Sequence, residues 1–110
     1  MEGLNKLKEL EYLNMAVNNV SKIEGIRNCE SIQKIDLTLN FIDFEDLKES
    51  CENMAECPDL CDLYLTGNPC DSNWKENCRD YVIAKVKTLT KYNGEDITKS
   101  ERLEALAKLP

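Results

Sequence analysis

The stretch Ile32-Gln-Lys-Ile35-Asp-Leu37-Thr-Leu-Asn40 decides the fold of this chain of 110 residues, because similar stretches stand before and after it. The two other copies are Leu10-Glu-Tyr-Leu13-Asn-Met15-Ala-Val-Asn18 and Leu60-Cys-Asp-Leu63-Tyr-Leu65-Thr-Gly-Asn68. The copies begin 22 and 28 residues apart. A recurrence of this length predicts a solenoid, in which each turn buries its apolar side chains against neighbouring turns.

Each copy has apolar residues at alternate positions of its centre, which predicts a short strand with side chains on opposite faces. The side chains expected to point inward are Leu13, Met15, Ile35, Leu37, Leu63 and Leu65. Downstream of the first copy, the residues expected to line the back of the turn are Val20, Ile23, Ile26 and Cys29. We interpret all of them as core.

The intervening strand positions form the candidate protein-binding surface, since repeat solenoids generally bind partners on their concave face. These outward residues are Tyr12, Asn14, Lys34, Asp36, Asp62 and Tyr64. Two tyrosines among charges are typical of an interface, because each ring offers apolar area with a polar tip. The alternative, a solvated sheet face without a partner, stays open.

Every copy ends in an asparagine at the point where the strand turns. The three residues are Asn18, Asn40 and Asn68. Stacked amides at this place can hydrogen-bond the backbone groups that a turning chain would otherwise leave unpaired. The sequence therefore predicts a structural ladder of buried asparagines along one edge.

The longer spacing before the third copy accommodates an acidic helix over residues 43–57, with Asp43 as N-cap. Its apolar side should consist of Leu47, Cys51 and Met54, which recur at helical spacing. The residues left in water should be Glu45, Glu49, Glu52 and Glu56. This charge run is either a solvated face or a docking site for a basic partner.

Residues 70–110 should form a cap that covers the last of the turns in residues 1–69. We expect Asp71 or Ser72 to start a helix, Trp74 to pack at its beginning, and Asn93-Gly94 to form a tight turn. The apolar side of that helix should be Tyr81, Val82, Val86 and Leu89. Thr98-Lys-Ser-Glu101 predicts a capping box, followed by a terminal amphipathic helix with Leu103, Leu106 and Leu109.

Composition argues against several classes of function. A formal net charge of −7 disfavours nucleic-acid binding, which relies on clustered Lys and Arg. No apolar run approaches a membrane span and no secretion signal is evident, so we expect a protein of the cytoplasm or nucleus, with the cytoplasmic location preferred. The chain has six cysteines without a Cys-x-x-Cys pair and has no histidine, so we expect no metal, no cofactor and no enzyme activity. Cys29 and Cys70 are better interpreted as small apolar fillers.

The repeats and the cap together resemble the intracellular leucine-rich repeat proteins with a C-terminal cap. The stretches that carry the resemblance in the cap are Asn68-Pro69-Cys70, Tyr81-Val82-Ile83 and Asn93-Gly94-Glu95-Asp96-Ile97. This class includes the leucine-rich regulatory subunit of protein phosphatase 1, a leucine-rich spliceosomal protein and the leucine-rich light chain of outer-arm dynein. Within it, the stretches from Leu10 to Asn19, Cys29 to Ile42 and Leu65 to Cys70 are most similar to the tilB-like dynein axonemal assembly factors.

The resemblance implies an α/β fold, a leucine-rich repeat solenoid with short parallel strands on the concave face and a helical C-terminal cap. It also implies a non-enzymatic scaffold for cytoplasmic preassembly of axonemal dynein arms, with dynein chains, assembly co-factors and chaperones as partners. The cilium or flagellum is a second expected location. The alternatives are a regulatory subunit of another complex, such as protein phosphatase 1, and an axonemal dynein light chain.

The chain departs from that family in three respects. Asn93 stands where the cap usually has aspartate, and Lys87 stands where a proline is common. The family also has further repeats upstream and a longer C-terminal region. Because only Leu4 and Leu7 precede the first complete copy, we expect its outer side to be uncapped and open to self-association.

Overall fold

The computed structural model describes residues 9–26, 29–72 and 78–108, and its strands form one sheet of five in the order β1-β2-β3-β4-β5. The strands are β1 (Tyr12–Asn14), β2 (Lys34–Asp36), β3 (Asp62–Tyr64), β4 (Lys91–Tyr92) and β5 (Glu95–Asp96). The helices are α1 (Phe44–Ala55), α2 (Pro69–Ser72), α3 (Cys78–Lys85) and α4 (Lys99–Ala107). The first four strands are parallel, and β5 closes the sheet as an antiparallel hairpin partner of β4.

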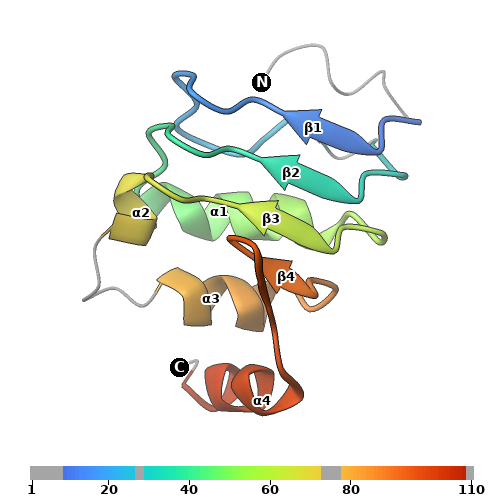
Figure 1. Ribbon diagram of the computed structural model, residues 1–110, viewed down its shortest axis with the longest axis vertical. Coiled ribbons are helices and arrows are strands. Elements are labelled where there is room, and N and C mark those ends of the chain that lie inside the picture. Colours follow the sequence, from blue (N-terminus) through green and yellow to red (C-terminus); the bar gives the residue numbers. More distant parts are fainter. Residues whose placement is uncertain (1–8, 27–28, 73–77, 109–110) are drawn as a thin grey trace.

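The sheet forms one layer, and α1 and α3 lie behind it, while α4 continues the stack beyond α3 (Figure 1). The three repeat strands coincide with the centres of the three copies, and their middle residues Leu13, Ile35 and Leu63 stand side by side in register. This α/β arrangement of parallel strands backed by helices is the expected architecture. Among the described residues, no helix is both long enough and apolar enough to cross a membrane.

The inward side chains build a core that continues from the first turn into the cap. All of the predicted inward strand residues are buried except Met15, which is half-buried and packs against the same core. The predicted back-lining residues Val20, Ile23, Ile26 and Cys29 are buried as well. The cap adds Tyr92, whose ring is almost fully buried on the inner side of β4. The alternation of the sequence therefore gives the correct inner face.

Helix α1 begins as predicted, because the Asp43 side chain accepts a hydrogen bond from Asp46 N at 2.9 Å. Its buried side contains the predicted Leu47, Cys51 and Met54, and its four predicted glutamates are exposed. Ser50 is also buried, which the sequence reasoning missed. Its hydroxyl accepts from Ile23 N at 2.9 Å, so α1 satisfies an amide of the irregular back of the first turn.

The predicted helix start at Asp71 or Ser72 is wrong, because both residues lie within α2, which begins at Pro69, and the helix with Tyr81 and Val82 is the separate element α3. Proline suits the first helical position, where its missing N–H would be unpaired anyway. Trp74 lies outside the described residues. In α3 and the segment after it, Val82, Val86 and Leu89 are buried as predicted. Tyr81, the fourth residue of the predicted apolar side, is half-buried. Its ring meets that of Phe44 in α1 edge-on, with ring centroids 5.4 Å apart.

Helix α4 confirms its predicted N-cap but not its predicted apolar side. The Thr98 hydroxyl accepts from Glu101 N at 3.0 Å. Ala105 is the buried residue of α4, whereas Leu103 is 60% exposed and Leu106 is also exposed. The prediction is wrong because α4 packs on α3 through the side that carries Glu101 and Ala105, so the leucines point elsewhere. Leu109 lies outside the described residues.

Candidate protein-binding surface

The structure brings the six predicted surface residues together on the outer side of the first three strands. They form two rows across the sheet, with Tyr12, Lys34 and Asp62 in one and Asn14, Asp36 and Tyr64 in the other. Tyr12 and Asn14 are exposed and the other four are half-buried. The surface is therefore continuous, and its residues come from three different turns.

A cation between two aromatic rings organises the centre of this surface. The Lys34 ammonium lies 4.9 Å from the centroid of the Tyr12 ring and 5.1 Å from that of the Tyr64 ring. Such contacts stabilise by about 0.5–1 kcal/mol each at exposed sites. We call these three residues the tyrosine–lysine stack, which joins side chains of three different turns.

The carboxylates on this surface do different work. Asp36 accepts from Thr38 N and from the Thr38 hydroxyl, so it fixes the turn after β2, and Asn14 accepts from Ala16 N in the same way after β1. Asp62 Oδ2 lies 4.0 Å from the Lys34 ammonium. Asp62 Oδ1 is buried and accepts no hydrogen bond from the described part of the chain. Asp62 is thus the group on this surface whose hydrogen bonding is incomplete.

The hairpin between β4 and β5 sets one boundary of the surface. Gly94 adopts a φ of +82°, and a Cβ there would lie 3.4 Å from the Tyr64 hydroxyl. The predicted Asn93-Gly94 turn is confirmed. Because that distance is an ordinary contact, the turn requires glycine for its left-handed φ and not for space beside the ring.

The asparagine ladder is present at two of its three predicted positions. Asn40 and Asn68 are buried and bridge neighbouring turns, since Asn40 Oδ1 accepts from Val20 N at 3.0 Å and Asn68 Oδ1 accepts from Ile42 N at 3.1 Å. Their amide groups donate to main-chain carbonyls of their own and the preceding turn. The ladder therefore ties the turns to one another.

The prediction of a buried Asn18 is wrong. Its side chain is exposed, and within the described part of the chain it donates to Met15 O and Ala16 O of its own turn. Among the described residues, no further turn packs against the outer side of the first one, and the Asn18 amide is left exposed. At the other end Asn93 extends the ladder, because its Oδ1 accepts from Leu65 N at 2.7 Å. The sequence signal for this role is the asparagine itself, whose amide oxygen suits a ladder position as well as its residue type suits a turn.

The titratable groups behind the sheet are suited to packing rather than chemistry. Burial raises the pKa of the Cys57 thiol to about 11, and it also raises the pKa of the Cys51 thiol. Burial likewise raises the pKa of Tyr92, whose hydroxyl donates to Asp71 Oδ1 at 2.9 Å and lies 3.3 Å from Cys78 Sγ. Thiols kept protonated in this way are poor nucleophiles and poor metal ligands. Within the described ranges, no three His, Cys, Asp or Glu residues are grouped to hold a metal.

The fold and the ladder define a leucine-rich repeat protein with a helical C-terminal cap. The same fold occurs in the crystal structure of the Drosophila melanogaster SNF/U2A' complex, where the match has a TM-score of 0.71 at 19% identity and covers 97% of this chain and 73% of that one. A match to the structure of the Chaetomium Mex67:Mtr2 subunits has a TM-score of 0.68 at 20% identity. These likenesses confirm the predicted fold class. No family model matches the sequence.

Relatives with similar sequences narrow this class. Dynein axonemal assembly factor 11 of Trypanosoma brucei brucei is 43% identical over 96% of this chain, and that of Mus musculus is 39% identical over 96%. Protein tilB of Drosophila melanogaster is 44% identical over 99%. The chain is related to dynein axonemal assembly factor 11 and tilB, as the motifs indicated. It spans 26%, 21% and 26% of the lengths of these three relatives.

Proposed function

We propose that the chain is a non-enzymatic protein-binding scaffold that acts in the cytoplasmic preassembly of axonemal dynein arms. The observation that carries this proposal is the identity of 39–44%, over 96–99% of the chain, to relatives named dynein axonemal assembly factor 11 or tilB. Mouse cilia- and flagella-associated protein 410, which is 29% identical over 92% of the chain, supports the same cellular setting. The partners would be dynein chains, assembly co-factors and chaperones.

The tyrosine–lysine stack and Asp62 support a protein as the ligand of the sheet surface. The Tyr12 residue is 49% exposed, so its ring is open to a partner. A tyrosine at an interface buries the apolar area of its ring, while its hydroxyl usually finds a hydrogen-bond partner. Lys34 and Asp62 place opposite charges beside it, which would orient a partner with complementary groups. A phosphate backbone is a poor fit, because the chain carries a net charge of −7.

The test is affinity capture of the tagged full-length protein from ciliated or flagellated cells, with quantification of axonemal dynein chains and their chaperones. The double variant Tyr12→Ala/Tyr64→Ala should lose most of this capture while its thermal unfolding shows a folded domain. Leu103→Ala is the matched control, because it truncates an exposed apolar side chain on α4. Recovery of a phosphatase subunit in place of dynein chains would refute the dynein role, and undiminished capture by the double variant would refute the sheet surface.

A further inference from the structure

Three large apolar side chains are exposed where the chain turns after β1 and β2. Val17 is 73% exposed, Leu39 is 54% exposed and Phe41 is 61% exposed. We call these three residues the apolar ridge. They lie away from the tyrosine–lysine stack, since they follow the strands and do not stand within them. Figure 1 shows the turns after β1, β2 and β3 at one end of the sheet, beside the start of α1.

Two residues of the apolar ridge adopt an unfavourable backbone conformation. Val17 has a φ of 57° and Leu39 a φ of 58°, and the equivalent residue of the third copy is Gly67, with a φ of 81°. This region suits glycine and asparagine, whereas a β-branched residue is a marked outlier there. Because Val17 and Leu39 are exposed, little hydrophobic stabilisation offsets the cost of this conformation. Glycine or asparagine would be more stable at both positions. Strain of this kind concentrates at functional sites.

The apolar ridge is one surface, because the turns that carry it are bonded together. Val17 N donates to Thr38 O at 2.8 Å, and Phe41 N donates to Val20 O at 2.8 Å. A Cβ on Gly67 would lie 2.5 Å from Leu39 Cδ2, so the leucine side chain lies across the glycine of the next turn. The ridge therefore lies on turns that are bonded to one another, and the Leu39 side chain reaches the third turn.

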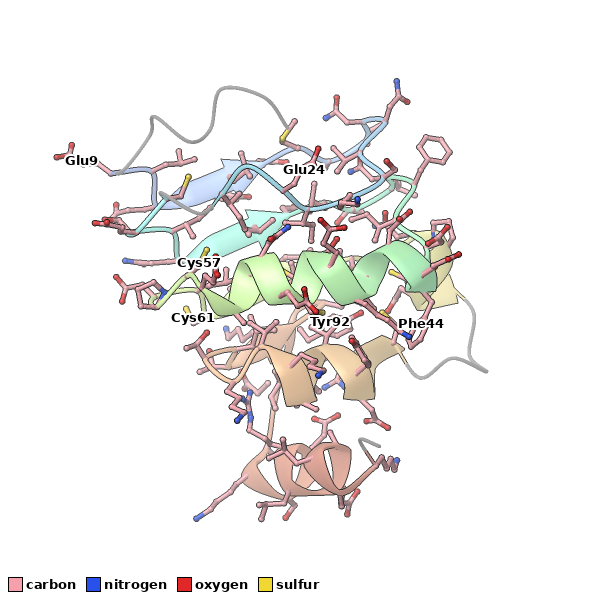
Figure 2. The ribbon with its side chains drawn as sticks, turned by 180° about the vertical axis from the view of Figure 1, so that it is seen from behind. Glu9, Glu24, Phe44, Cys57, Cys61 and Tyr92 are labelled. Carbon is pink, nitrogen blue, oxygen red and sulfur yellow. The ribbon has the colours of Figure 1, made fainter. Side chains whose placement is uncertain are left out.

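The charged residues around the apolar ridge define which partner chemistry would complement it. The segments 9–21, 35–47 and 63–71, which contain the turns, include no Lys or Arg. Asp43 and Glu45 are exposed close behind Phe41, at the start of α1. Figure 2 shows Phe44 at this end of α1, with Cys57 and Cys61 near the other end. Among the described residues, the turns that carry the ridge and the start of α1 are therefore apolar and acidic.

We infer that the apolar ridge is a second docking surface, which binds a segment of a partner protein that combines large apolar residues with Lys or Arg. The apolar side chains of such a segment would cover Val17, Leu39 and Phe41. Its cations would face Asp43 and Glu45, and this attraction would weaken with added salt. This inference does not depend on the sheet surface or on the dynein role.

The probe is a fluorescent helical peptide of about fourteen residues built from Leu and Lys, titrated into the full-length protein while anisotropy is recorded. One control peptide has Glu in place of Lys, and another has Ser in place of Leu. We expect binding of the Leu-Lys peptide that weakens in high salt, and much weaker binding of both controls. Equal binding of the Leu-Glu peptide would overturn the proposed partner chemistry.

The decisive variants are Val17→Asn and Leu39→Asn, because asparagine tolerates the left-handed conformation at both positions. Each should weaken peptide binding about tenfold, a size typical of a central interface residue. Neither should lower the thermal midpoint. Leu103→Asn, on α4, is the control and should change nothing. A clear fall in the thermal midpoint of Leu39→Asn would show that the ridge serves the fold, and a dimer abolished by that change would show that a second copy covers it; either result overturns the inference.

Discussion

Replacing Asn40 by alanine tests how the turns are held together. The Asn40 amide donates to Met15 O at 2.9 Å and to Leu37 O at 3.0 Å, and its Oδ1 accepts from Val20 N at 3.0 Å. The variant removes all of these bonds from a side chain that is almost fully buried. The consequence depends on which of the backbone groups keeps another partner.

In the variant, the carbonyls of Met15 and Leu37 keep another hydrogen-bond donor, whereas the main-chain N–H of Val20 keeps no acceptor among the described residues. Met15 O also accepts from the Asn18 side chain, and Leu37 O also accepts from the Asn68 side chain at 2.8 Å. The buried Val20 N–H loses its acceptor, which costs about 1–3 kcal/mol. With the bonds lost at the carbonyls, we expect Asn40→Ala to reduce the free energy of unfolding by about 2–4 kcal/mol.

Asn18→Ala is the matched control, because it changes the same position of the first copy. Asn18 is exposed, and its hydrogen bonds among the described residues stay within its own turn, so we expect a loss below about 1 kcal/mol. Equilibrium unfolding in urea resolves the two, since a loss of 3 kcal/mol lowers the midpoint by about 1–3 M at ordinary m-values. Equal losses in the two variants would refute the distinction between a buried and an exposed rung of the ladder.

Three more outcomes follow from the cap and the thiols. Hydrogen bonds from Arg79 lower the pKa of Glu101, so the charged pair stabilises the fold above pH 4.5. This contribution disappears as the pH falls through the lowered pKa. Glu101→Gln should therefore lower the free energy of unfolding at pH 7 and flatten the acid limb of a stability–pH curve. Gly94→Ala should cost about 1 kcal/mol in thermal or urea unfolding, because alanine is strained at a φ of +82°, and no change would contradict this. Cys61 is the one thiol that is not buried, so a chromogenic disulfide reagent should react rapidly with about one thiol per native chain, and fast reaction of several would exclude this packing.

The features that sequence reasoning predicted correctly are those fixed by local spacing. The strands follow from the alternation around Leu13, Ile35 and Leu63, and the N-caps Asp43 and Thr98 follow from side-chain chemistry at helix starts. Each depends on a few consecutive residues. The turn at Asn93-Gly94 belongs to the same group.

The features that sequence reasoning missed depend on the tertiary contacts of a residue, that is, on which distant residues pack against it. Asn18 has the same local motif as Asn40, but a rung of the ladder is buried only when a neighbouring turn covers it. Leu103 and Leu106 have helical spacing, yet α4 approaches α3 through Ala105. Ser50 is buried because it satisfies an amide of the first turn. The spacing of residues along the sequence does not predict these tertiary contacts.

The ladder and the apolar ridge occupy consecutive residues, and this proximity gives the ladder a second role. A left-handed conformation costs a residue such as Leu39 about 1–2 kcal/mol, which an isolated turn would relieve by relaxing. Asn40, the residue that follows Leu39, prevents that relaxation. Its side chain is anchored to two turns by buried hydrogen bonds, which together stabilise by more than the strain costs. The same bonds that hold the solenoid together thus keep Val17 and Leu39 projecting into solvent. The loss of an amide in the ladder should therefore weaken binding at the apolar ridge even in a chain that still folds.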